Sequence, residues 1–340
     1  MRIAVDAHGG DFGLEPNIEG AAKAARDFGL EVVFVGDADR INAAVQKFGL
    51  ASDRRLSVMP AACVAGMGAE PVQELKDKPD CSVMVCADLV KRGKADALVS
   101  AGNSGATMVA AFLKLGRIKG IPRPAIAVPL PTAAGVCLLL DAGANVECKP
   151  LHLLHFAAMG SVYAREVLGL ENPSVGVLSV GEEESKGNAL VKETIPLLKQ
   201  SGLNYKGPVE GRDIPAGTVD VVVCDGFTGN IALKLYEGAG KAVVQIIRQE
   251  VEKRPLAKLG MLLALPAFRA VKSIINPDRY GGAPLLGVDG VAVISHGRSN
   301  SEAMHNAVRC ARHTVKSGVN AKIRAEAARI GEIFKSQTQQ

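Results

Sequence analysis

Short apolar runs alternate with segments of helical periodicity along most of this chain. The apolar runs predict strands over residues 2–7, 31–36, 56–60, 95–101, 175–180, 219–224 and 291–295. The helical spacing predicts helices over residues 17–28, 39–48, 80–92, 106–115, 150–168, 189–198 and 301–334. Apolar runs without polar alternation are typical of strands buried on both faces. The order therefore predicts an α/β fold in three α/β/α layers, with a mostly parallel sheet and helices on both sides.

Three segments break this alternation. Residues 125–130 and 136–140 are apolar runs around a proline-bearing turn, which predicts an antiparallel hairpin. Residues 250–276 are cut by two prolines into two short helical pieces. Residues 280–287 predict a glycine-rich loop. No internal repeat or flexible linker separates these segments, so we expect residues 1–340 to form one domain, either as one α/β unit or as two lobes that share a sheet.

The composition and charge of the chain limit the classes of partner that we expect for this protein. The chain has 340 residues, is 48% hydrophobic, and carries 40 basic against 35 acidic residues, which gives a formal charge of +5. It has no long basic block, no Trp and only 4% aromatic residues, so nucleic acid is not an expected partner. A mild basic excess suits an acidic protein partner or an anionic membrane surface.

Neither a metal nor a cofactor is expected. The seven cysteines are scattered without a CxxC pair, which suggests small core residues in a reducing cytosol. His152 and His155 share a helical face, but no third metal ligand accompanies them. GxGxxG does not appear in the turn after the first expected strand, and GxxxxGK[ST] and GxSxG are absent from the sequence.

The start of the chain and its apolar stretches favour a cytoplasmic location. Met1 leads almost directly into the first expected strand, which leaves no room for a signal peptide. The apolar stretches are shorter than the roughly 20 residues that span a bilayer. We expect a cytosolic protein that visits a membrane surface.

The turn after residues 219–224 is the first candidate site. Asp225, Thr228, Gly229 and Asn230 follow this strand at the start of an expected helix. A helix N-terminus offers unpaired N–H groups and partial positive charge to an anion. The alternative is an ordinary helix cap, for which Thr, Asn and Gly are common.

Two further turns follow expected strands in the same way. One contains Gly102, Asn103 and Ser104, and another contains Gly9, Gly10 and Asp11. In open α/β sheets, ligands bind outside the carboxyl ends of the strands. We therefore expect the turn of Gly102 and Asn103 and the turn of Gly229 and Asn230, which we call the two Gly-Asn turns, to face one cleft.

Lys186 is a cation near the expected start of a helix, an end that disfavours positive charge. One interpretation is that it awaits an anion. The other is a solvated side chain paired with Glu182, Glu183 or Glu184.

Residues 250–276 combine basic charge with excess apolar surface. The apolar positions of the two expected helical pieces are Leu256, Leu259, Met261, Leu262, Leu263, Leu265, Phe268, Val271 and Ile275. The surrounding cations are Lys253, Arg254, Lys258, Arg269 and Lys272. This pattern suggests a membrane-surface or dimer contact, with a lid packed on the protein's own core as the alternative.

Seven segments in register resemble the PlsX family of acyl-ACP:phosphate acyltransferases over nearly the whole chain. They are DAHGGD (6–11), SAGNSGA (100–106), DAGANVECKP (141–150), GEEESKGN (181–188), VEGRDI (209–214), DGFTGN (225–230) and YGGAPLLGVDG (280–290). The resemblance implies that inorganic phosphate attacks a long-chain acyl carrier protein thioester, giving acyl phosphate for phosphatidic acid and phospholipid synthesis. It also implies a fold similar to phosphotransacetylases and isocitrate-type dehydrogenases, plus a protruding helical hairpin.

The resemblance also implies roles for particular residues. Lys186 and Asn230 match the family's catalytic loops; we assign Lys186 to phosphate and Asn230 to the thioester or a phosphate oxygen. The three turns would supply further donors, and Asp225 would orient Lys186 or Asn230. The departures are His8, where the family usually has Met, and Ser104, where it usually has Thr.

The implied partners are acyl carrier protein, inorganic phosphate, a second copy in a homodimer, a membrane surface and a membrane glycerol-3-phosphate acyltransferase. Leu259, Met261, Leu262, Phe268 and Val271 are the residues expected in the dimer or membrane contact of the hairpin.

Three alternatives stay open at this point. An enzyme that uses acyl-CoA fits the fold but leaves the basic hairpin unexplained. A nicotinamide-linked dehydrogenase lacks its glycine fingerprint and a metal-binding carboxylate cluster. A membrane-associated scaffold for lipid synthesis would bind membranes without catalysis.

Overall fold

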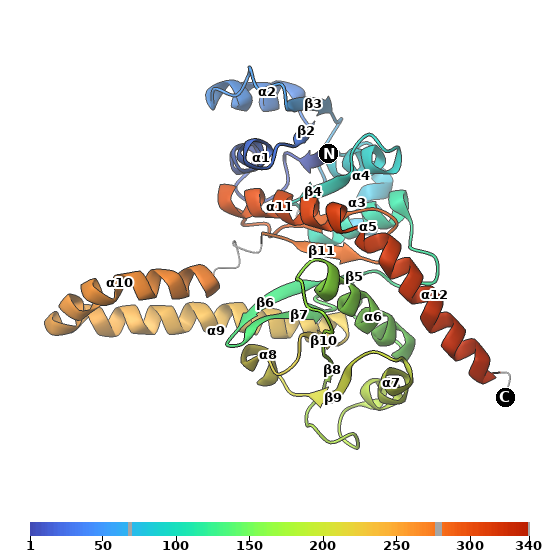
Figure 1. The fold of residues 1–340 in the computed structure, drawn as a ribbon. Coiled ribbons are helices and arrows are strands. Elements are labelled where there is room, and N and C mark those ends of the chain that lie inside the picture. The colour runs from blue at the N-terminus through green and yellow to red at the C-terminus, as the bar shows by residue number, and fades with distance from the viewer. Residues whose placement is uncertain (67–69, 276–280, 339–340) are drawn as a thin grey trace.

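The strands of this protein form two sheets, which lie one above the other in Figure 1. The computed structural model describes residues 1–66, 70–275 and 281–338. The seven-stranded sheet has the order β3 (Leu56–Pro60), β2 (Glu31–Gly36), β1 (Arg2–Asp6), β4 (Ala97–Ser100), β12 (Ala292–Ile294), β11 (Ala283–Leu286), β5 (Ala125–Ile126). The five-stranded sheet has the order β6 (Val128–Thr132), β7 (Gly135–Leu140), β10 (Val221–Val223), β8 (Val175–Leu178), β9 (Tyr205–Val209). We call the two sheets with their helices the first and the second lobe.

Most strand pairs are parallel, as predicted. The antiparallel pairs are β11 with β12, β11 with β5, and β6 with β7. The last of these is the predicted hairpin. The alternative of two lobes that share a sheet is wrong, because the strands divide into two sheets. Only Ala127 separates β5 of the first lobe from β6 of the second. Pro129 and Pro131 lie in β6 and lack N–H donors, which fits its place at a sheet edge.

The first lobe has the predicted three layers. Successive residues of β1 point to opposite faces, so Ile3 and Val5 enter one apolar core while Ala4 enters the other. The core of Ile3 is covered by α1 (Leu14–Phe28), α2 (Ala38–Lys47) and α11 (Ser301–Ser317). The opposite core is covered by α3 (Pro71–Asp77), α4 (Ser82–Lys91) and α5 (Ser104–Leu115).

The second lobe repeats this layering. Leu138 and Leu140 of β7 face a core shared with α6 (Pro150–Glu166), α7 (Ala189–Gln200) and α12 (Val319–Thr338). Leu139, between them, faces a smaller core with α8 (Asp213–Ala216) and the first turns of α9 (Gly226–Glu252). The layered prediction is confirmed twice, whereas the single-domain interpretation stays a prediction.

The C-terminal segment is two helices where one was expected. Gly318 adopts φ 64°, the left-handed conformation that glycine adopts without strain, and ends α11 there. The second of these helices, α12, is a core element of the second lobe. Its Val319, Ile323 and Ile330 are buried in the core of the second lobe.

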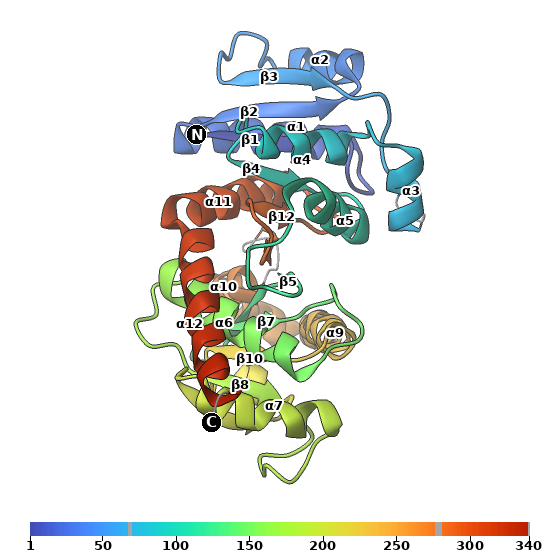
Figure 2. The same cartoon turned by 90° about the vertical axis from the view of Figure 1, so that its right-hand side faces the viewer.

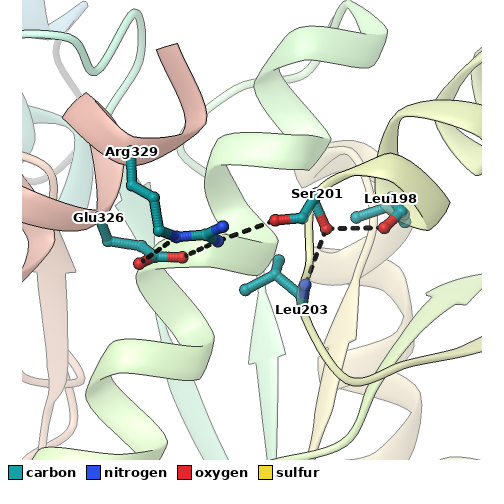
Figure 3. A network of polar contacts seen from close by, with 5 residues as sticks. All are labelled: Leu198, Ser201, Leu203, Glu326 and Arg329. Carbon is teal, nitrogen blue, oxygen red and sulfur yellow. Dashed lines mark hydrogen bonds and ion pairs between the residues drawn. The ribbon is translucent and has the colours of Figure 1, made fainter. Parts of the chain in front are cut away.

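Polar contacts also bind α12 to the second lobe (Figure 3). Arg329 donates to the carbonyl oxygen of Ser201 at 2.8 Å, and Glu326 holds its guanidinium. The Ser201 hydroxyl donates to Leu198 O and accepts from Leu203 N, which closes the turn between α7 and β9. The end of the chain is therefore part of both lobes.

The protruding hairpin is longer than predicted. Its arms are α9 and α10 (Pro255–Ile275), which extend away from both lobes in Figure 1. Pro255 starts α10, a position that tolerates proline, but Pro266 lies inside the helix instead of cutting it. The prediction of two short helical pieces within residues 250–276 is therefore wrong, because one helix spans Pro255–Ile275.

The apolar side chains of α10 do not form a core contact. Leu259 is 61% exposed, Leu262 67%, Phe268 39% and Val271 49%, and Met261 is partly buried. The exposed fractions of these side chains do not fit the alternative prediction that the hairpin is a lid packed on the protein's own core. The side chains of Lys272 and Ile275, and the whole of Asn276, lie outside the described residues.

Four elements escaped the sequence patterns. They are α3, α8, β9 and β11. Residues Ala283–Leu286 were expected in a glycine-rich loop, but Leu285 and Leu286 are buried between β12 and β5. Tertiary pairing decides this strand, because its flanking glycines and Pro284 are typical of a turn. Tyr280, in the same expected loop, lies outside the described residues.

Candidate active site

The predicted turns lie at the carboxyl ends of their strands. In the first lobe, β1, β4 and β12 are parallel neighbours, so the turns after them leave the same edge of the sheet. In the second lobe, β7, β10 and β8 are likewise parallel, and the turns after them share an edge. The arrows of β1 to β4 point to the right in Figure 2, toward the side where α9 begins.

Glycine allows the first-lobe turns to approach closely. A Cβ atom on Gly9 would lie 2.5 Å from the backbone nitrogen of Gly102. Gly10 has φ 103°, and a Cβ there would lie 2.9 Å from Gly297 O. Asp11 N also donates to Gly297 O at 2.6 Å. The turns after β1, β4 and β12 therefore form one packed cluster.

A buried carboxyl group supports this cluster from below. Ser100 Oγ donates to Asp6 Oδ2 at 2.7 Å and accepts from Gly102 N at 3.1 Å. Burial raises the pKa of Asp6, and the hydrogen bond from Ser100 opposes this rise. Gly102 N thus donates to Ser100 Oγ, and a role for Gly102 in anion binding stays a prediction.

Asn103 acts as the cap of α5. Its Oδ1 accepts from Ala106 N at 3.1 Å, and its backbone carbonyl accepts from Thr107 Oγ1 at 3.1 Å. Ser104, the first residue of α5, is exposed. The cap interpretation holds for Asn103, and the exposed helix end beside it stays a candidate anion site.

Asp225 is the cap of α9, and the helix begins at Gly226, two residues before Thr228. Its carboxylate accepts from Thr228 N and from Thr228 Oγ1, each at 2.8 Å. The predicted contact of Asp225 with Lys186 or Asn230 is not among the hydrogen bonds of the described residues. Both donors of Thr228 are committed to Asp225, so Thr228 is a positioning residue for the helix end.

Asp141 and Asn145 shape this turn, and the sequence patterns did not select them. Asp141 is buried and accepts from Ile126 N at 3.0 Å, Ala144 N at 3.0 Å and Asn145 N at 2.7 Å. Burial raises the pKa of Asp141, and these N–H groups oppose the rise. Asn145 O in turn accepts from Gly226 N at 2.7 Å. A polar Asp-Ala-Gly-Ala-Asn run directly after a buried strand was the available signal.

Asn230 lies beside this shaped loop. A Cβ on Gly143 would lie 3.6 Å from Asn230 Cβ, so the loop after β7 and the first turn of α9 are in contact. Any side chain on Gly229 would overlap the carbonyl oxygen of Asp141. Asn230 is exposed. The side chain of Asn230 thus lies against Gly143 while the residue stays exposed.

Lys186 lies in the loop after β8, which precedes α7. That helix begins at Ala189 with Asn188 as its cap, so Lys186 is not at the helix start as expected. Lys186 Nζ pairs with Glu183 at 2.9 Å, with the two side chains 52% and 61% exposed. This hydrogen bond raises the pKa of Lys186. The paired interpretation describes the structure, and the exposed cation remains accessible to an anion.

The sheet places Lys186 and Asn230 at one edge without bringing them into contact. Val177 of β8 pairs with Val223 of β10, so the two loops leave neighbouring strand ends. No hydrogen bond or ion pair among the described residues joins the two side chains directly. A shared catalytic role for the two residues stays a prediction.

The turn after β12 was not predicted as part of the site. Burial lowers the pKa of His296, and the charge of Lys234 of α9 lowers it further. Arg298 lies 3.7 Å from Asp11. His296 therefore faces α9 from the first lobe, and Leu233 of α9 packs against the core of the first lobe. The first lobe therefore contacts α9 beyond its first turn, and the shared cleft of the two Gly-Asn turns stays a prediction.

Nothing among the described residues suggests a metal site or a spanning helix. Within residues 1–66, 70–275 and 281–338, no three metal-ligating side chains are grouped to hold an ion. Across the same ranges, no helix combines the length and apolar character that crossing a bilayer requires.

Comparison with known proteins identifies the family. The sequence model described as "Fatty acid synthesis protein" matches residues 1–322. A phosphate acyltransferase of Elusimicrobium minutum is 57% identical over 334 residues, which cover 98% of each chain. A phosphate acyltransferase of Geotalea uraniireducens is 51% identical, over 95% of this chain and 93% of the relative.

Solved structures confirm the predicted fold class. A phosphotransacetylase from Streptococcus pyogenes superposes with a TM-score of 0.64 at 18% identity, covering 93% of this chain and 94% of that one. The EutD phosphotransacetylase from Staphylococcus aureus gives 0.59 at 16% identity, over 92% and 94%. The family model and the two relatives bear out the resemblance found in the sequence and show that this chain belongs to the fatty acid synthesis protein family of phosphate acyltransferases.

Proposed function

We propose that this protein transfers a long-chain acyl group from acyl carrier protein to inorganic phosphate, giving the acyl phosphate used in phospholipid synthesis. The observation that carries the proposal is the shared edge of β8 and β10, where an exposed cation, Lys186, and an exposed amide, Asn230, leave neighbouring strand ends. Phosphate itself is the nucleophile in this scheme, so no protein nucleophile is needed.

The reaction is balanced without a cofactor. A phosphate oxygen forms a bond to the thioester carbonyl carbon, and the electron pair of the C–S bond leaves with sulfur. The thiolate, with a pKa of about 8.5, takes a proton from solvent and needs no strong acid. The product is a mixed anhydride of the fatty acid and phosphoric acid.

Each residue has a proposed role in this scheme. Lys186 neutralises the incoming phosphate, which is partly dianionic at neutral pH. Asn230 donates from its amide to the thioester oxygen as negative charge develops there. The exposed start of α5 at Ser104 and the turns of Gly9 and Gly10 form the opposite wall of the cleft. Holding both reactants in line supplies much of the acceleration.

The hairpin has a separate proposed role. The exposed leucines of α10 and the cations near them suit a membrane surface or a second copy of the chain. We propose a cytoplasmic homodimer that associates peripherally with the membrane and passes its product to a membrane acyltransferase.

The deciding experiment measures free-thiol release from palmitoyl-carrier protein, with and without phosphate. The expected result is phosphate-dependent release, with palmitoyl-CoA in parallel as a poorer donor. Release that ignores phosphate would exclude the proposal. A clear preference for palmitoyl-CoA would instead favour the acyl-CoA reaction that the phosphotransacetylase fold also accommodates.

A further inference from the structure

Four exposed cations gather where the segment after α5 meets the start of α6. Arg117, Lys119 and Arg123 lie in that segment, and Lys149 is the residue that caps α6. An open recess of about 490 Å³ lies between the two segments, with Arg117 and Lys119 on one wall and His155 of α6 on the other. We call these four residues the basic rim.

The charge of the basic rim is not neutralised by the protein. None of its four members forms an ion pair within the described part of the chain, whereas Lys186 and Lys199 both do. Burial lowers the pKa of His152, and the charges of Arg123 and Lys149 lower it further. Arg123 and Lys149 therefore both act on His152, although they lie in different segments of the chain.

The acidic residues close to the rim do not change this balance. Glu147 is exposed on the same segment as Lys149 and forms no ion pair among the described residues. Asp289 donates its backbone N–H to Gly116 O, but its carboxylate is held by Arg324 at 2.6 Å. The net charge of the surface remains positive.

Apolar side chains lie inside the rim. Leu151, which lines the recess, is 46% exposed, and Val146 is 66% exposed. The ring of Phe112 lies 5.7 Å from the Arg117 guanidinium and is 39% exposed. An apolar centre surrounded by unpaired cations is complementary to a protein face that has an apolar contact surrounded by carboxylates.

The same segment connects the rim to the catalytic turn. Asn145 accepts from Gly226 N at the start of α9, and four residues later the chain reaches Lys149. Burial raises the pKa of Cys148, between them, to about 12, and Asp141, Asp225 and Arg123 all act on this thiol. The loop of residues 141–149 thus contacts the start of α9 through Asn145 and reaches the basic rim at Lys149.

We propose that the basic rim is the docking surface for the acidic face of the thioester-bearing carrier protein. The inference rests on the proposed function, because that function supplies a carrier whose thioester must reach Asn230. Long-range attraction to an acidic face raises the association rate, and the apolar centre holds the docked partner. The rim lies beside the loop that shapes the catalytic turn, so a docked carrier presents its arm to the cleft.

The test is a triple charge reversal, Lys119→Glu with Arg123→Glu and Lys149→Glu. We expect the KM for palmitoyl-carrier protein to rise at least about tenfold with kcat within twofold, because each lost charge contact weakens encounter and docking. The rate with S-palmitoyl pantetheine, which has no protein face, should stay unchanged. The KM of the variant should also lose most of its dependence on salt.

A matched reversal separates docking from general attraction. Arg54→Glu with Lys91→Glu and Lys94→Glu changes the net charge equally at exposed positions elsewhere in the first lobe. An equal rise of KM in both variants would overturn the docking surface in favour of net charge alone. No rise in either would overturn it as well.

Two further measurements keep the docking proposal distinct from the proposed function. Titration of acylated carrier protein against wild type and both variants gives Kd without turnover, so docking is tested even if phosphate-dependent thiol release fails. Sedimentation of the rim variant should show the wild-type oligomeric state. Loss of a dimer in this variant would identify the rim as an interface between copies, which would also overturn the proposal.

Discussion

The carboxylate of Asp225 accepts both the backbone N–H and the hydroxyl of Thr228, each at 2.8 Å. This pair fixes the first turn of α9 and commits both donors of Thr228. Among the polar side chains of that turn, Asn230 is left facing outward. The relationship explains why a capping residue matters for a reaction that it does not touch.

We expect Asp225→Ala to lower both stability and activity. Loss of an N-cap acceptor costs about 1 kcal/mol of unfolding free energy. A loosened first turn also misplaces Asn230, so kcat should fall more than KM rises. Asp37, the cap of α2, accepts from Asp39 N and Arg40 N and provides a control. Asp37→Ala should lose similar stability in urea unfolding with kcat unchanged; equal kcat in both variants would contradict the positioning role.

Removal of either proposed catalytic side chain should reduce the rate with the fold intact. Asn230→Ala and Lys186→Ala are each expected to lower kcat/KM about 10² to 10³-fold, the usual cost of one oxyanion donor. Lys186 and Asn230 are both exposed, so thermal unfolding should be nearly unchanged. A loss below about tenfold would remove that residue from the proposed mechanism.

Gly229→Ala should be far more harmful than a glycine change further along the same helix. The new methyl group would overlap Asp141 O, so the turn must move, at about 1 to 3 kcal/mol. Gly238, also in α9, has open space around a Cβ, and Gly238→Ala should stabilise the protein by up to about 1 kcal/mol. Chemical denaturation of both variants measures the contrast, and similar values would show that the close approach is relaxed in solution.

Acid should destabilise the protein partly through His155. Burial lowers the pKa of His155 to about 4, against about 6.5 in an unfolded chain. The unfolded state therefore binds this proton first, and stability falls as pH drops from about 6.5 to about 4. The full loss from this group is about 3 kcal/mol.

His155→Phe isolates this contribution, because it removes the titrating ring nitrogens and keeps a similar shape. Urea unfolding at several pH values should show a shallower loss of stability below pH 6.5 than in wild type. Stability at pH 8, where both states hold a neutral ring, serves as the internal reference. Parallel pH curves for the two proteins would show that the pKa of His155 is the same in the folded and unfolded states.

The hairpin should be dispensable for stability and needed for association. Leu262 is 67% exposed, so Leu262→Glu should leave thermal unfolding of the lobes nearly unchanged. Binding to anionic liposomes, or the dimer seen by sedimentation, should weaken because the apolar surface now carries a negative charge. Val72→Glu, at a 43% exposed position of α3, is the control and should alter neither.

Local pattern was sufficient for the parts of the fold that depend on local sequence. The buried β-branched run at Val221–Val223 could be placed because strand signals are short-range. The cap of the next helix was not predicted at Asp225, for which we expected a role in orienting Lys186 or Asn230. β11 could not be placed, since Pro284 and its glycine neighbours signal a turn and only pairing with β12 and β5 makes it a strand. The prediction at Pro266 was wrong because the proline was expected to end a short helix, whereas the long exposed helix α10 continues through it.

The candidate site divides in the same way. Lys186 stood out because a cation is unusual near an expected helix start, whereas Asn230 was selected by the glycine-bearing turn around it and by the family resemblance. Asp141 and Asn145 were not selected, since their role is to hold Gly226 and the loop in place through contacts that no spacing rule specifies. His296 escaped because its position opposite Lys234 depends on how two lobes are arranged.

The place of β12 between β4 and β11 has a consequence for synthesis of the chain. The ribosome makes β4 by Ser100 and reaches Ala292 about 190 residues later, an interval of about 10 to 40 s at usual elongation rates. During that time the second lobe can complete its strands, while the edge of β4 has no neighbour on one side. An open edge of this kind is a template for pairing with other chains. Newly made copies therefore pass through a stage at which the first lobe needs protection from aggregation, and that stage ends only when β12 emerges.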